Sequence, residues 1–320
     1  MVRIAVAGGS GSVAREIIDA LVATNQHEIL LLSRKDAPPP EKAVPGVTWV
    51  KANYNDVEQL AQVLQGVDTV LSLIVVHLDT GNVAQRNLID AAVRAGVRRF
   101  APSEWATSSI SFEYMPWYAG KAEIRQYLED LNKDKKILEY TLFQPGIFVN
   151  YLTYPYQSAK HVPMMHTPFD FNKRRVLIVE GSEDVGVTLT TAEDVANVVA
   201  RAVEYEGEWP AVGGIKGTEL TVRQLIQLGE KIRGGPFNVE KLKAEDLKAG
   251  VLKASWIPKL EHYSFSPEEA EALSPKFVAG LLLGKSAGAW NVSDEWNRLL
   301  PDYQFTQAED FLTEAWRGKP

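Results

Sequence analysis

The sequence predicts an α/β fold in which a doubly wound parallel sheet is joined to a smaller, mostly helical part. Two observations lead to this prediction. Apolar, strand-like runs alternate with amphipathic helical patterns through the first half of the chain, which is typical of a parallel sheet with helices on both faces. A glycine-rich stretch, Gly8-Gly-Ser-Gly-Ser-Val13, directly follows the first of these runs and precedes the first helical pattern. This order predicts a nucleotide-binding sheet of the Rossmann type.

The elements of the first half follow one another without a long break. We expect strands at 3–7, 28–32, 47–51, 69–75, 98–102 and 139–143. We expect helices at 14–23, 57–64, 82–95 and 120–131. Asn55 or Asp56 can begin the second helix, and Gly96 can end the third.

After residue 150 the alternation breaks down. A segment rich in Tyr, Pro, Met and His extends to residue 171, and a strand at 175–179 and a helix at 192–205 then resume the pattern. Further helices are expected at 222–232, 267–273, 275–283 and 307–316, with capping signals at Thr191, Ser266 and Thr306. We therefore expect a nucleotide-binding domain at 1–150, with 186–205 contributing, and a substrate domain built from 151–185 and 206–320.

The composition is that of an ordinary globular chain, and it excludes several classes. A net charge of −7 over 320 residues argues against binding to nucleic-acid backbone. The absence of cysteine excludes disulfides and thiolate chemistry, and the five histidines (27, 77, 161, 166 and 262) have no metal-ligand spacing, so we expect no metal. No apolar run is long enough to span a membrane. Because strand-like sequence starts at Val2, with no signal peptide before it, we expect a cytoplasmic protein. We expect it to be a monomer or a homodimer.

The glycine-rich stretch has the parts that a dinucleotide phosphate needs. Gly8 and Gly11 allow a tight turn and a close approach of the backbone to the pyrophosphate. The helix that begins near Ser12 directs unpaired N–H groups at the anion, and Ala14 provides the third small position. The candidate contacts in this stretch are Gly8, Ser10, Gly11, Ser12 and Val13.

The end of the second strand indicates which dinucleotide binds. A site that prefers NAD places a carboxylate there, whereas this chain has Ser33, Arg34 and Lys35. A guanidinium and an ammonium can hold a 2′-phosphate, so we expect NADPH; the alternative is a solvated basic turn. Asn53, at the end of the third strand, is a further candidate for cofactor binding.

Ligands of open α/β sheets bind beyond the carboxyl ends of the strands, so the residues at those ends are candidates for the reactive half of the site. Apolar groups there can cover a nicotinamide ring, although each alone could also belong to the core. The candidate cofactor contacts are Leu73, Ile74, Ser103, Pro145 and Phe148.

Lys121 begins the helix after the fifth strand and is our candidate catalytic residue. If burial lowers its pKa toward neutrality, it can bond ribose hydroxyls and transfer a proton. The alternative is an exposed lysine paired with Glu123 and Arg125 on a solvated face. Tyr118 lies three residues earlier, shares a helix face with Lys121, and is a second catalytic candidate.

Several of these features together resemble one family. The run Arg98-Arg-Phe-Ala-Pro-Ser-Glu-Trp105, the early glycine turn, the Ser33-Arg34 pair, Lys121 and the turn Pro145-Gly-Ile-Phe148 resemble the NmrA-like and isoflavone-reductase-like family of atypical short-chain dehydrogenases. The resemblance covers the whole chain and is strongest over 1–150. It implies an NADPH-dependent reductase of aromatic or phenolic secondary metabolites, with the catalytic lysine at Lys121 and a lid that includes Phe148.

The chain departs from related patterns at two positions. Ordinary short-chain dehydrogenases have a tyrosine four residues before the lysine, where this chain has Trp117, and plant reductases commonly have glycine where it has Ala106. The resemblance also leaves a second function open, because the family includes NAD(P)-sensing regulators that bind a protein partner without turnover. Lys121 favours the enzyme, because a sensor needs no proton carrier.

The substrate expected from these features is a bulky, aromatic small molecule. An aromatic lid could come from Trp105, Trp117, Tyr118, Tyr151 and Tyr154, although any of these could be core at a domain boundary. Glu104 is counted with the substrate site, but we expect its carboxylate to bond local backbone rather than act as an acid.

Overall fold

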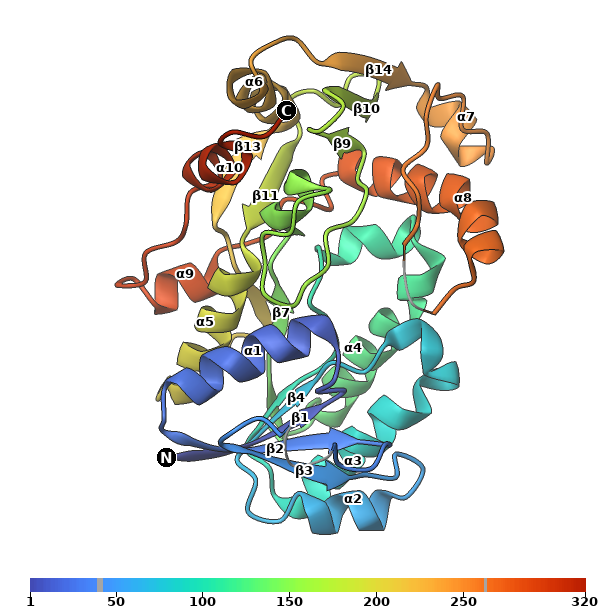
Figure 1. Ribbon diagram of the computed structural model, residues 1–320. Helices are drawn as coiled ribbons and strands as arrows, with labels where there is room; N and C mark the ends of the chain where they lie inside the picture. Colours follow the sequence, from blue (N-terminus) through green and yellow to red (C-terminus); the bar gives the residue numbers. More distant parts are fainter. Residues whose placement is uncertain (39–42, 262–263) are drawn as a thin grey trace.

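The computed structural model describes residues 1–38, 43–261 and 264–320. A parallel six-stranded sheet forms one end of the molecule, with the strand order β3-β2-β1-β4-β5-β6 (Figure 1). Its strands are β1 (Val2–Ala7), β2 (His27–Ser33), β3 (Val47–Lys51), β4 (Thr69–Ser72), β5 (Arg99–Ala101) and β6 (Glu139–Tyr140). The order reverses between β1 and β4, and ligands of such sheets bind outside the strand ends at that point. The predicted fold class is confirmed.

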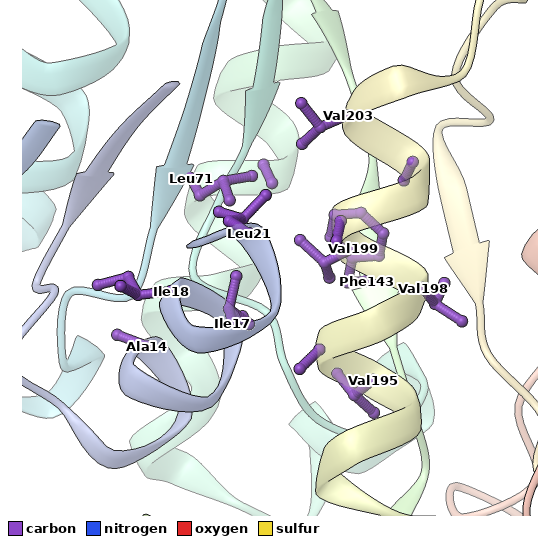
Figure 2. Packing of buried hydrophobic residues seen from close by; sticks show 14 of the residues in the cluster. Ala14, Ile17, Ile18, Leu21, Leu71, Phe143, Val195, Val198, Val199 and Val203 are labelled. Carbon is purple, nitrogen blue, oxygen red and sulfur yellow. The ribbon is translucent and has the colours of Figure 1, made fainter. Parts of the chain in front are cut away.

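Helices cover both faces of this sheet because side chains alternate along each strand. Ile4 and Val6 of β1 pack into a core shared with α1 (Ser12–Ala23) and α5 (Ala192–Glu204), which lie side by side (Figure 2). Ala5 and Ala7 point to the other face and a second core. That core is completed by α2 (Val57–Val63), α3 (Val83–Ala95) and α4 (Ala119–Leu131).

The second part of the chain lies at the other end of the molecule (Figure 1). Its helices are α6 (Val222–Arg233), α7 (Ala244–Lys248), α8 (Pro267–Ser286), α9 (Glu295–Leu299) and α10 (Ala308–Trp316). Three small sheets accompany them, formed by β7 (Leu142–Gln144) with β12 (Val212–Gly214), by β8 (Ile147–Phe148) and β11 (Gly186–Thr190) with β13 (Thr218–Thr221), and by β9 (Phe169–Asp170) and β10 (Arg175–Val179) with β14 (Asn238–Leu242). Of these short strands, the sequence pattern predicted only β10 as a separate strand.

Most predicted helix ends are confirmed by the capping contacts. The side chain of Asp56 accepts the Gln59 N–H, Thr191 accepts the Asp194 N–H, and Gly96 ends α3 in the left-handed conformation. Ser266 forms a complete capping box with Glu269.

Two helix predictions are wrong. Pro275 does not divide α8, which continues through it; the proline leaves the carbonyl of the exposed Glu271 without its usual N–H donor. Thr306 does not cap α10: its hydroxyl lies 3.3 Å from a carboxylate oxygen of Asp194 instead, and the helix begins after Gln307.

Two predicted strands also differ in the structure. β4 ends at Ser72 rather than at residue 75, and short 3₁₀ turns (Val76–Leu78 and Thr80–Asn82) follow it. The predicted strand at 139–143 is divided into β6 and β7, which belong to different sheets. The stretch from Gly280 to Ser286, whose Gly280, Gly284, Lys285 and Ser286 resemble a phosphate-binding loop, is the end of α8.

Candidate active site

The turn between β1 and α1 is built around two glycines with different roles. Gly8 has φ +73°, and a Cβ there would lie 2.5 Å from the backbone oxygen of Leu73 at the end of β4. The fold itself therefore requires glycine at this position. At Gly11 a Cβ would meet only the backbone oxygen of Gly8, at 3.4 Å, so a side chain there would instead obstruct whatever approaches the turn.

The first turn of α1 leaves backbone donors free. Gly11 precedes the helix, no side chain caps it, and there is no acidic residue in the first turn. Within the described parts of the chain, the N–H groups of Ser12, Val13 and Ala14 have no hydrogen-bond acceptor. Unpaired N–H groups and the positive end of the helix dipole fit the oxygens of a phosphate. Ser10 is exposed beside them.

Arg34 and Lys35 form an exposed basic corner at the end of β2. Neither side chain has an ion-pair partner among residues 1–38, 43–261 and 264–320, whereas Lys51 on the neighbouring strand pairs with Asp36 at 2.7 Å. The corner is held by backbone contacts, since the Lys35 N–H donates to Ser33 Oγ at 3.1 Å. Two cations without partners at this point can bind a 2′-phosphate.

Tyr54 lies between the basic corner and the glycine turn, and the sequence reasoning missed it. Its ring is buried and its hydroxyl donates to the carbonyl oxygen of Leu32 at 3.2 Å. Burial raises the pKa of Tyr54 to about 12, against the opposing effects of the Gly8 backbone and the Arg34 charge. Asn53, which the sequence reasoning chose, is exposed, and its Oδ1 accepts the Asn55 N–H at 3.1 Å. After β3, buried residues (Ala52 and Tyr54) alternate with exposed ones, and this alternation is the sequence signal that could have indicated Tyr54 instead of Asn53.

Lys121 is buried at the start of α4, with 7% of its surface exposed. Its Nζ donates to the backbone oxygens of Ser103, at 2.8 Å, and Glu104, at 2.5 Å. Burial lowers the pKa of Lys121 to about 8; the Glu104 charge acts against this shift and the Arg125 charge adds to it. The alternative of a solvated lysine paired with Glu123 is wrong.

The Glu104 carboxylate is also buried and is paired with Arg125. Arg125 Nε donates to Glu104 Oε1 at 2.9 Å, and Nη2 contacts the other carboxylate oxygen. The expectation that this carboxylate bonds local backbone is wrong: only the Glu104 N–H makes a local contact, to the oxygen of Pro102 at 2.7 Å. Ser103 is fixed beside it, because its N–H donates to the buried Gln85 Oε1 at 2.6 Å.

Tyr118 lies close to Lys121, and Tyr151, from a different element, lies near Tyr118. The Lys121 Nζ is 5.0 Å from the centroid of the Tyr118 ring. Burial and the Glu104 charge raise the pKa of Tyr118 to about 12, and burial together with Tyr118 raises the pKa of Tyr151. Neither hydroxyl has a hydrogen-bond partner in the described structure. An ammonium group therefore lies beside one neutral phenol with an unused donor, and a second such phenol lies next to the first.

The two tryptophan candidates, Trp105 and Trp117, each stack on another aromatic ring. Trp105, at φ +43°, stacks on Phe143 with centroids 5.1 Å apart and donates to the Ser72 oxygen at 2.8 Å, so its ring is part of the core. Trp117 stacks on Phe277 of α8 at 5.0 Å, a contact that the sequence did not reveal because the two residues are 160 positions apart.

The remaining candidates lie along the strand ends and the segment after β8. Phe148 is buried against Tyr151, with centroids 5.6 Å apart, and the Tyr154 ring lies 3.9 Å from that of His166. The Pro145 carbonyl accepts from Thr190 at 2.8 Å. Leu73 and Ile74 are half-buried beyond β4.

Within the described residues there is no cluster of His, Asp and Glu that could hold a metal ion, and His262 lies outside those residues. No described helix is both long and apolar enough to cross a membrane.

Comparison with known proteins gives a consistent picture. A model described as the NmrA-like family matches residues 2–312. The oxidoreductase swnN of Metarhizium robertsii is 26% identical over all of this chain and 98% of its own length. The oxidoreductase BOA1 of Botryotinia fuckeliana is 31% identical over 73% of this chain and 77% of its own. The crystal structure of an NADPH-dependent quinone oxidoreductase from Escherichia coli, complexed with NADPH, has a TM-score of 0.69 at 21% identity and covers 98% of this chain and 99% of that one.

Proposed function

The chain belongs to the NmrA-like family, and from that premise we propose that it is an NADPH-dependent oxidoreductase that reduces a C=C or C=O bond of a bulky aromatic small molecule. Its relative swnN, matched over 98% of its length, is an oxidoreductase by name, and one of its structural neighbours is a quinone oxidoreductase complexed with NADPH. Both support the reaction class.

One observation carries the proposal: the ammonium group of Lys121 is buried beside the Tyr118 ring, whose hydroxyl has no partner among the described residues. A lysine with a pKa of about 8 can give up a proton near neutral pH, which an exposed lysine does poorly. NADPH, when bound, supplies the hydride. Lys121 then supplies the proton to the atom of the substrate that gains negative charge and takes up another from water, and the Tyr118 hydroxyl assists as a hydrogen-bond donor to the substrate.

The residues of the glycine turn and the basic corner fit this cofactor. We propose that the free N–H groups at the start of α1 bind the pyrophosphate and that Arg34 and Lys35 bind the 2′-phosphate. Further proposed cofactor contacts are Gly8, Ser10, Gly11, Ser12, Val13, Asn53, Leu73, Ile74, Ser103, Lys121, Pro145 and Phe148.

The substrate side is proposed to include Trp117, Tyr151 and Tyr154, whose rings can stack on an aromatic molecule. Glu104 and Trp105 are held inside by Arg125 and Phe143, so in this proposal they support the site from behind. In domain terms, residues 1–150 with 186–205 hold the cofactor, and 151–185 with 206–320 hold the substrate.

The test is a turnover assay on the purified protein with NADPH and a panel of quinones, enones and phenolic compounds. We expect consumption of NADPH with at least one class, loss of that turnover in Lys121→Met, and NADPH binding that is weaker but still measurable by calorimetry in the same variant. Lys133→Met, at an exposed position beyond α4, is the matched control and should behave like the natural protein. NADPH binding without consumption across the whole panel would contradict the enzyme and favour a nucleotide-sensing regulator.

A further inference from the structure

The ammonium group of Lys121 uses two of its three N–H donors within the protein. These two donate to the backbone oxygens of Ser103 and Glu104. The third has no acceptor among the described residues, so it is the one that can pass a proton to a substrate. Because the two carbonyls determine where the third N–H points, displacement of either oxygen would misdirect the proton.

The Ser103 carbonyl belongs to a stretch of backbone outside every described helix and strand. β5 ends at Ala101, Pro102 has no N–H, and the Glu104 N–H returns to the Pro102 oxygen at 2.7 Å. The Ser103 N–H donates instead to a side chain, Gln85 Oε1, at 2.6 Å. The position of this peptide group therefore depends on a residue of another element, α3.

Gln85 is itself held firmly in the interior. It is 1% exposed, on a helix whose next turn places Leu88 and Ile89 in the core. A buried amide is costly unless its polar atoms are bonded, and the Ser103 N–H bonds its oxygen. The Asp79 carboxylate fixes the start of the helix, because it accepts the N–H groups of Ala84, at 2.9 Å, and Gln85, at 3.0 Å.

We propose that Gln85 is a positioning residue: through the Ser103 peptide it holds the acceptor that orients the ammonium group of Lys121. This inference rests on the proposed function, in which Lys121 gives the proton. The charged groups that act on Lys121 are Glu104 and Arg125, and the Tyr118 ring lies beside it. Gln85 is neutral, so replacing it with another neutral side chain moves the acceptor without changing the charge of the site.

The first test needs no turnover. It is an NMR titration of the full chain with isotope-labelled lysine, in which the Lys121 signal is identified by its loss in Lys121→Met. A hydrogen bond accepted from an ammonium group favours the charged form, so weakening it lowers the pKa. We expect a midpoint near 8 in the natural protein. In Gln85→Met, which has a similar size and no amide, the midpoint should fall by about half a pH unit.

Two further replacements of Gln85 keep this test decisive. Gln85→Asn retains an amide but is one methylene shorter, so it should shift the midpoint in the same direction, and it replaces Gln85→Met if that variant does not fold. Gln85→Glu restores an acceptor oxygen at the original chain length whether or not it is protonated, so the midpoint should not fall.

Asn132→Leu is the matched control. Asn132 Oδ1 also accepts backbone N–H groups, those of Ile137 at 2.8 Å and Leu138 at 3.0 Å, but it does so just beyond the far end of α4. This variant loses a comparable amide acceptor and should leave the midpoint unchanged. An unchanged midpoint in the folded Gln85→Met or Gln85→Asn variant, a fall in Gln85→Glu, or an equal fall in Asn132→Leu would each overturn the inference.

The second test measures turnover. With an acceptor that the natural protein reduces, Gln85→Met should lower kcat about tenfold and change the KM for that acceptor less than about twofold, because a misdirected proton slows the chemical step and leaves binding intact. A kcat equal to that of the natural protein would remove Gln85 from the reaction. If the natural protein consumes no NADPH with any compound, the proposed function fails, and the NMR titration still decides whether Gln85 positions the amine.

Discussion

Lys121 Nζ lies 2.5 Å from the backbone oxygen of Glu104, and the carboxylate of the same glutamate is paired with Arg125. Glu104 thus acts on the lysine twice, through a hydrogen bond from its backbone and through the charge of its side chain. That charge raises the pKa of Lys121, while burial and Arg125 lower it. The balance leaves the pKa at about 8, and the proton-donating capacity of the site depends on this balance.

The first prediction concerns pH. A reduction in which Lys121 gives the proton requires the ammonium form, so kcat/KM at saturating NADPH should be level below pH 8 and fall as the pH rises through about 8. The measurement is a pH–rate profile with the best acceptor from the panel. A rate that stays level until the ordinary lysine range near 10.5 would contradict the role given to Lys121.

The second prediction concerns Glu104→Gln. Removing the negative charge lowers the pKa of Lys121 further, so the falling limb of the pH profile should move to lower pH. The same change leaves Arg125 without its partner in the interior and should cost about 3 kcal/mol of unfolding free energy. Glu129→Gln serves as a control for both measurements, and a limb that does not move in Glu104→Gln would show that this carboxylate does not tune the lysine.

The third prediction separates the two glycines of the phosphate turn. Gly8→Ala should destabilise the fold by about 1–3 kcal/mol, since the position needs a positive φ and has no room for Cβ. Gly11→Ala should have the same unfolding free energy as the natural protein, because its Cβ meets only the Gly8 oxygen. It should nevertheless bind NADPH much more weakly, because the added Cβ obstructs the approach of the pyrophosphate to the turn. Chemical denaturation and calorimetry distinguish these outcomes. Undiminished NADPH binding in Gly11→Ala would place the pyrophosphate elsewhere.

The fourth prediction concerns Arg34. Arg34→Ala should weaken NADPH by about 2 kcal/mol, the size of a lost charge-assisted hydrogen bond, and leave NADH nearly unchanged. Lys51→Ala removes a neighbouring cation that is already paired with Asp36, so it should affect the two coenzymes equally and little. Equal weakening of NADPH and NADH in Arg34→Ala would contradict the assignment of the 2′-phosphate.

The parts of the molecule that could be predicted are those whose signals are local. The glycine turn, the caps at Asp56 and Thr191 and the alternation of strands and helices each depend on residues that are near one another in the sequence, so a parallel sheet with helices on both faces could be predicted from them. The position of Lys121 could be predicted in the same way. Its burial could not, because the two carbonyls that hold it come from the end of β5, 17 and 18 residues earlier.

The missed residues depend on distant contacts or on an unexpected backbone conformation. Phe277 reaches Trp117 only because α8 packs across the chain, and Gly280 allows that approach: a Cβ there would lie 2.5 Å from the Tyr114 oxygen. Trp105 was expected in the open site, but its positive φ turns the ring onto Phe143. The short strands of the second part are too brief for an alternation to be visible in the sequence.

The last prediction concerns Lys285, which is fully buried near the end of α8. Its ammonium group has no hydrogen-bond partner among the described residues and lies 5.3 Å from the centroid of the Phe169 ring. Burial lowers its pKa to about 7, and the charge of Glu183 acts against the shift. Since the unfolded chain keeps a lysine pKa near 10.5, unfolding takes up a proton between pH 7 and 10.5.

The sign of the effect follows from this proton uptake. The stability of the natural protein should rise with pH across that window, by up to about 1.4 kcal/mol per pH unit from this group. Below pH 7 both states carry the proton and the cost of burying the charge is present in full. Lys285→Met removes the charge and keeps an apolar chain of similar size, so it should stabilise the fold most below pH 7 and progressively less toward pH 10.5. Denaturation at a series of pH values measures this, with Lys276→Met, exposed on the same helix, as the control. A variant less stable than the natural protein below pH 7 would mean that the buried ammonium has a partner that compensates its charge.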